Sequence, residues 1–158
     1  RASRPASAGG LAQTLGLTPQ PMDVLQLPGK TWFVQFEYSH GWGCATHDGH
    51  IWFAERGNFI PLLPLLEQPW PEASAFVTSA CQALGIEAEF PFEQVVQSAL
   101  GWPTEYWPSQ ALTWFTQGFP ASGASRQQLA ALADNKAMSP HLRQQARALS
   151  GARNASEA

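Results

Sequence analysis

Three side chains with metal-binding or nucleophilic chemistry follow one another at three-residue spacing. Cys44, His47 and His50 form the pattern C-x-x-H-x-x-H. Thiolate and imidazole groups are common zinc ligands, and a cysteine activated by a histidine is a common nucleophile. Either kind of site requires the three side chains to share one side of the local structure. The chemistry therefore depends on the elements that carry them.

The turn between the two histidines decides which side each residue occupies. Asp48-Gly49 lies between apolar runs and is a preferred pair for a two-residue type I′ hairpin turn. With the turn there, His47 faces His50, whereas Cys44 lies on the opposite side of the ribbon. The sequence therefore predicts that Cys44 is a small buried residue and not a partner of the histidines.

The two histidines by themselves support two interpretations. The favoured one is a solvated hairpin tip with two polar residues. The alternative is a divalent metal site or a hydrolytic centre at the tip, because paired imidazoles bind metals and titrate near neutral pH. Glu37 or His40 would then have to supply a further group. On the favoured interpretation, the chain has no catalytic residue, no metal ligand and no cofactor.

A candidate binding surface follows from the alternation of residues in 31–39. The even positions form an apolar face, and the odd positions, among them Phe33 and Glu37, form the other face. Trp52 lies on the histidine side of the hairpin. An exposed Trp and Phe beside an acidic residue are typical of a binding hot spot. The candidate binding residues are Phe33, Glu37, His47, His50 and Trp52. This face is either exposed or covered by residues 11–27.

The fold class is predicted as α+β, with an N-terminal three-stranded antiparallel meander followed by five or six short helices. Strands are predicted at 31–39, 43–47 and 50–55. Apolar residues at helical spacing, closed by Gly or opened by Pro, predict the helices. These helices are placed at 58–68, 72–84, 92–100, 107–115, 125–135 and 139–151.

The length of 158 residues suits one domain with a core of its own. We place this domain at residues 23–150. The segment 1–21 begins with RASRPASAGG, which is poor in apolar residues, and it is predicted to be a disordered arm. A short tail at 151–158 is predicted to be disordered as well.

The charges are unevenly distributed along the chain. Residues 23–119 hold ten acidic and two basic residues, whereas residues 120–158 hold two acidic and five basic ones. An acidic body argues against general nucleic-acid binding and favours a basic protein partner. No apolar run approaches the roughly 20 residues that span a bilayer, so no membrane segment is expected.

The two cysteines, Cys44 and Cys81, each lie in an apolar pattern and are predicted to be buried free thiols. Free thiols fit a reducing compartment, and the N-terminal residues lack the apolar stretch of a secretory signal. The sequence therefore predicts a cytoplasmic protein. It contains none of the hydrolase, zinc-protease or phosphate-binding loop motifs that would indicate a reaction.

The C-terminal third resembles small uncharacterised bacterial proteins, including some of toxin-immunity type. A Trp-containing helix in ALTWFTQGFP ends in Gly, and LAALADNKAMSPHLRQQARAL follows with two short helices. The residues that carry the resemblance are Trp114, Gly118, Asn135, Lys136, Ser139, Leu142, Arg143, Ala146 and Leu149. The resemblance implies a toxin-neutralising role and carries over no active site.

These observations favour a non-enzymatic protein-binding module. Together with the resemblance, they suggest a bacterial immunity-type protein that neutralises a basic toxin through an acidic, aromatic surface. One alternative is a metal-binding or hydrolytic enzyme that uses His47 and His50 at the hairpin tip. The other is a structural subunit that associates with itself through the aromatic face.

Overall fold

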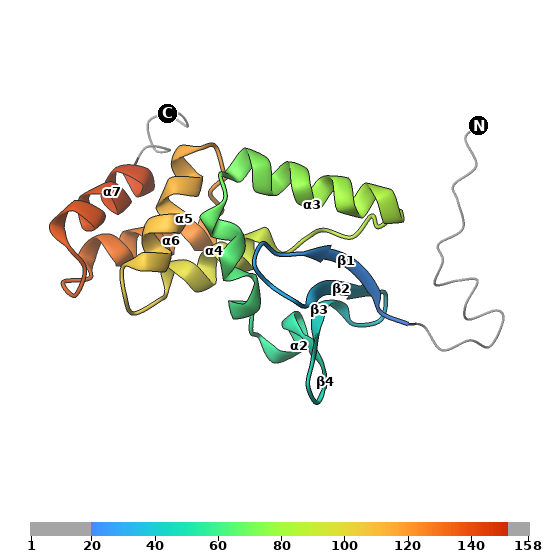
Figure 1. Cartoon of the computed structure of the whole chain (residues 1–158). Coiled ribbons are helices and arrows are strands. Elements are labelled where there is room, and N and C mark those ends of the chain that lie inside the picture. The colour runs from blue at the N-terminus through green and yellow to red at the C-terminus, as the bar shows by residue number, and fades with distance from the viewer. Residues whose placement is uncertain (1–19, 152–158) are drawn as a thin grey trace, which may run out of the picture. The chain divides into compact units, whose positions relative to one another are not determined.

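Residues 20–151 are described by a computed structural model of the chain (Figure 1). The chain divides into two units, residues 1–58 and residues 59–158. Each unit is described by itself, and the single domain predicted over 23–150 stays a prediction. The predicted arm and tail fall outside the described residues, apart from positions 20, 21 and 151.

The first unit is built on a four-stranded antiparallel sheet with the strand order β1-β2-β3-β4 (Figure 1). Its strands are β1 Met22–Gln26, β2 Phe33–Glu37, β3 Gly41–Thr46 and β4 Gly49–Trp52. The last three are the predicted meander, so the α+β class is confirmed. The predicted number of strands is too low, because β1 was not expected.

An irregularity in β1 explains why its sequence does not look like a strand. The register with β2 shifts between Asp23 and Leu25, as at a β-bulge. A bulge adds a residue to one strand and interrupts the alternation of polar and apolar residues. Leu25 is buried, whereas Asp23 is exposed on the other face.

The hairpin turn between β3 and β4 lies one residue earlier than predicted. The last pair is Thr46 with Gly49, so His47 and Asp48 are the turn residues. A type I′ turn at Asp48-Gly49 would need positive φ at both positions, and no described non-glycine residue has positive φ. In this register His50 pairs with Ala45 and His47 lies in the turn, so the predicted pairing of His47 with His50 is wrong.

One face of the sheet is apolar and buried. Its buried residues are Leu25, Val34, Phe36, Trp42 and Cys44. The predicted third strand ends early, because a short helix, α2 Phe53–Arg56, follows β4 directly. Phe53 is fully buried at the start of α2, and Gly57 ends the helix in the left-handed conformation with φ of 60°.

The second unit consists of helices that follow the predicted apolar stripes (Figure 1). They are η1 Ile60–Glu67, a 3₁₀ helix, then α3 Trp70–Leu84, α4 Phe92–Leu100, α5 Tyr106–Thr116, α6 Gly123–Asp134 and α7 Pro140–Gly151. The core contains Leu62, Leu63, Leu65, Leu66, Val95, Val96, Leu112, Trp114 and Leu129. Trp114 is fully buried, and its Nε1–H donates a 2.8 Å hydrogen bond to the carbonyl of Gln68 at the end of η1.

Polar contacts define both ends of α6. The predicted start at residue 125 is too late, because Ser122 is the N-cap and Ser125 occupies the N3 position of a capping box. At the other end, Arg143 Nε and Arg147 Nη2 of α7 each donate a 3.2 Å hydrogen bond to the carbonyl of Ala133. The two arginines therefore supply donors to the last turn of α6.

No helix within residues 20–151 is both long enough and apolar enough to cross a membrane.

Candidate functional site: the outer face of the sheet

Trp52 is the centre of the sheet's outer face, opposite the apolar one. It pairs with Gly43 of β3, where an added Cβ atom would lie only 2.5 Å from the indole. The ring is parallel to two imidazoles. The ring centroid of His40 lies 5.0 Å from that of Trp52, with 9° between the ring planes. The ring centroid of His50 lies 5.4 Å away, with 16° between the planes. The half-buried indole is therefore held in place by a neighbouring backbone and two stacked rings.

His40, in the β2–β3 turn, lies between two carboxylates. Its Nδ1 is 2.5 Å from Oε1 of Glu55 in α2, and its Nε2 is 3.7 Å from Oε2 of Glu37. The hydrogen bond to Glu55 is the main reason that the pKa of His40 is raised, and the charges of Glu55 and Glu37 act in the same direction. The cationic imidazole is thus favoured where it stacks on Trp52, and an aromatic face attracts a cation.

Glu37 is the buried member of this group. Its exposed fraction is only 5%, and its Oε2 has no hydrogen-bond partner among the described residues. A buried carboxylate oxygen without a donor is costly unless a positive charge is near. The charged His40 ring meets this requirement, although 3.7 Å is too long for a hydrogen bond.

A second polar chain crosses the same face. Gln35 Nε2 donates a 2.8 Å hydrogen bond to Oδ1 of Asp23 on β1. The Oε1 of Gln35 lies 3.0 Å from Nδ1 of His50 on β4. Because an amide oxygen only accepts, Nδ1 of His50 carries the donated proton. On β3, between these strands, Gly43 pairs with Gln35 and Ala45 pairs with His50, and both are small residues.

Four of the five predicted binding residues lie on this outer face. Phe33 is 40% exposed, Trp52 is half-buried, His50 is exposed and Glu37 is buried. The fifth, His47, lies in the turn, where its side chain is 98% exposed and contacts Asp48. Whether any of these residues binds a partner stays a prediction.

Sequence reasoning missed several residues that hold this face together. Asp23 lies on the unexpected strand, and Glu55 was taken as the end of a strand rather than part of a helix. Gln35 alternates with Phe33 and Glu37 in the sequence, and this alternation could have placed it on the outer face. His40 was noted only as a possible extra ligand, since nothing in the sequence showed that its turn approaches Trp52.

The arrangement offers recognition chemistry more readily than catalysis. Cys44 pairs with Ile51 and Val34 on the buried face, so its thiol is separated from the histidines, as expected. Burial raises the pKa of the Cys44 thiol, which disfavours the nucleophilic thiolate. Within residues 20–151 there is no group of three His, Cys, Asp or Glu residues that could hold a metal ion. The outer face presents aromatic stacking surfaces and carboxylates.

Comparisons of the chain with protein-family models, with curated proteins and with solved structures find no match. The resemblance of the C-terminal third to immunity-type proteins therefore stays a prediction, and the function has to be argued from the geometry of the outer face.

Proposed function

We propose that the chain is a non-enzymatic protein-binding module that takes a basic partner on the outer face of its sheet. The observation that carries this proposal is the fixed position of Trp52. Gly43, His40 and His50 hold the indole before any partner arrives. A side chain that is already ordered loses little conformational entropy on binding, and Trp is the residue type most enriched at binding hot spots.

The charges around Trp52 favour a basic partner. Asp23 and Glu55 are exposed, and the side chain of Glu55 has an exposed fraction of 53%. Exposed carboxylates at the rim of an interface accelerate the approach of a positively charged protein. Glu37, the acidic residue among the predicted binding residues, is buried, so the steering charge belongs to Asp23 and Glu55.

A basic toxin is the partner that fits both this binding face and the resemblance of the C-terminal third to immunity-type proteins. An immunity-type protein binds its toxin without catalysing a reaction, which agrees with a face that offers stacking and charge. The two free, buried thiols suit a cytoplasmic place of action. Neither the metal-binding alternative nor self-association receives a specific observation in its favour.

The test starts from the genes next to the one that encodes this chain, and a basic protein encoded there is the titrant. Replacing Trp52 with Ala should weaken its binding at least about thirtyfold, since a truncated Trp hot spot loses about 2 kcal/mol or more. The matched control is Trp102→Ala, which removes a half-buried Trp from the helical unit. Circular dichroism establishes that both variants stay folded. Equal affinities for the Trp52→Ala variant and the original chain would contradict the proposal.

A further inference from the structure

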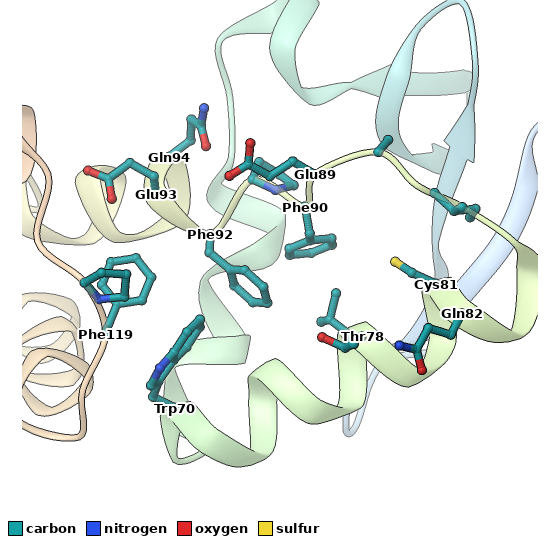
Figure 2. Close-up of a pocket in the computed structure, with 15 residues that line it drawn as sticks. Trp70, Thr78, Cys81, Gln82, Glu89, Phe90, Phe92, Glu93, Gln94 and Phe119 are labelled. Atoms are coloured by element: carbon teal, nitrogen blue, oxygen red, sulfur yellow. The ribbon is translucent and has the colours of Figure 1, made fainter.

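A cavity of about 540 Å³ lies in the helical unit, between α3 and the segment 86–94 (Figure 2). Its volume is within the range of roughly 300–1,000 Å³ that small-molecule sites have. All of its lining residues come from 70–120, so the cavity belongs to one unit. It lies outside the sheet face on which the proposed function depends.

Aromatic rings form the walls of this cavity. Figure 2 shows the rings of Phe90 and Phe92 pointing from the segment 86–94 toward α3, with Trp70 and Phe119 at one end. The ring centroids of Trp70 and Phe92 are 5.0 Å apart, with an angle of 87° between the ring planes. The ring centroids of Trp70 and Phe119 are 4.8 Å apart, with an angle of 90° between the ring planes. These edge-to-face contacts fix the rings relative to one another. A flat or apolar group inside the cavity would therefore meet ring surfaces that are already positioned.

The charge of the cavity is negative. Glu89 and Glu93 are its charged lining residues, and no Lys, Arg or His lines it. From Trp70 to Pro120 the sequence contains five acidic residues and no basic residue or histidine. Thr78 and Gln82 of α3 and Gln94 of α4 add polar groups to the lining.

One feature opposes the negative charge. The N-terminus of α4 lies at the cavity edge, and a helix N-terminus carries about half a positive charge. Glu93 in the first turn of α4 carries a full negative charge at the same place. Its Oε1 accepts a 3.1 Å hydrogen bond from Gln97 Nε2 and another from the hydroxyl of Ser122, which hold the carboxylate at this end. The carboxylates outweigh the helix end.

We propose that this cavity binds a small organic cation, an amine or quaternary ammonium group attached to an apolar body. The apolar body packs against the rings of Trp70, Phe90 and Phe92. The cationic group is attracted by the ring faces and by Glu89 and Glu93. A carboxylate or phosphate ligand is repelled by the same two residues.

A series of ligands with one apolar body and different charge tests the proposal. 2-Phenylethylamine, 2-phenylethanol and phenylacetate are titrated into the full chain and followed by NMR. The amine should bind most tightly, the alcohol more weakly and the carboxylate weakest. Equal affinity for the amine and the alcohol, or no binding of the amine, would overturn the proposal.

The thiol of Cys81 shows whether the ligand is in the cavity. Cys81 lines the cavity, whereas Cys44 lies in the other unit, and both thiols are free and buried. At about pH 8 the amine should slow alkylation of Cys81 by iodoacetamide and leave the rate at Cys44 unchanged. Equal slowing at both thiols, or none at Cys81, would place the ligand elsewhere and refute the site.

Two substitutions in the segment 86–94 separate the effect of the Glu89 charge on amine binding from that of the chain's overall charge. Glu89 lines the cavity and Glu87 does not, although both are exposed. Glu89→Gln should weaken amine binding roughly two- to fivefold, as for an exposed ion pair, and leave alcohol binding unchanged. Glu87→Gln should leave amine binding unchanged. The same loss in both variants would show that only the general charge of the chain matters, and it would overturn the assignment.

Discussion

The indole of Trp52 lies so close to Gly43 on the neighbouring strand that a Cβ atom at position 43 would come within 2.5 Å of ring atom Cε3. No larger residue fits there unless the indole or a strand moves. The backbone carbonyl of Ile51 is also too close to such a Cβ atom. Gly43 is therefore needed for the close approach of a ring and a backbone, rather than for an unusual backbone conformation.

Replacing Gly43 with Ala should destabilise the sheet unit by about 1–3 kcal/mol, as expected for an overpacked site. Urea unfolding measures the loss. Combining Gly43→Ala with Trp52→Phe should recover part of it, because a smaller ring leaves more room. The recovery is partial, since the carbonyl of Ile51 stays in place. Strictly additive effects of the two substitutions would show that the indole does not press on position 43.

The stability of the sheet unit should depend on the protonation of His40. The pKa of His40 is raised, chiefly by its hydrogen bond to Glu55. A raised folded-state pKa means that the stabilisation is complete below pH 6.5 and is lost as the pH rises through the higher folded-state value. Melting temperatures measured across this interval should fall with pH.

Two variants test whether His40 causes this pH dependence of the melting temperature. His40→Gln should remove it, because no imidazole then titrates between Glu37 and Glu55. His47→Gln should keep it, since His47 lies in the exposed turn. An unchanged slope in the His40→Gln variant would show that another group is responsible.

The two histidines of the hairpin should respond differently to truncation. His50 stacks on Trp52 and donates to Gln35, so His50→Ala should lower stability by about 0.5–1.5 kcal/mol. His47→Ala should change stability by less than about 0.5 kcal/mol, as at most exposed sites. Thermal unfolding compares them directly, and equal losses would contradict the observed register.

Arg143 and Arg147 should act together on the end of α6. Both donate to the carbonyl of Ala133, so either one alone still leaves that carbonyl with a donor. Each single Ala variant should therefore have a small effect, and the double variant should lose more than the sum, roughly 0.5–1.5 kcal/mol. Gln144→Ala, on an exposed position of α7, is the control in the same unfolding assay. Simple additivity would show that the shared carbonyl does not couple them.

The helices could be predicted well because their signals are local. Apolar spacing gave Phe92–Leu100 at its observed bounds, and Gly85 ends α3 in the left-handed conformation that glycine favours. The start of α6 was placed two residues late, at residue 125 instead of Gly123, because Ser122 and Ser125 both suit a cap. Each serine hydroxyl accepts a hydrogen bond from the other's backbone N–H, and only the structure shows that Ser122 is the N-cap and Ser125 the N3 residue.

The sheet was harder to predict, because strand register depends on contacts between distant residues. Asp48-Gly49 is a strong local turn signal, and the turn nevertheless begins at His47. The outer face was predicted to carry Phe33 and Trp52 together, which the pairing supports. The contacts of His40 with Trp52 and Glu55 could not be predicted. They join a turn, a strand and a helix, and no periodic pattern in the sequence indicates that these three elements meet.

The helical unit also has an uneven charge along its own sequence. Residues 60–119 hold six acidic and no basic residues, whereas residues 123–151 hold four basic and one acidic residue. In Figure 1, α6 and α7 lie together at one end of this unit, and α3 lies at the other. The acidic and basic segments nevertheless meet in space, because Glu93 accepts a hydrogen bond from Ser122 at the start of α6 and Glu105 accepts one from the backbone N–H of Ser139 before α7. The opposite charges therefore partly cancel beyond a Debye length of about 8 Å, and the unit should orient only weakly in an electric field.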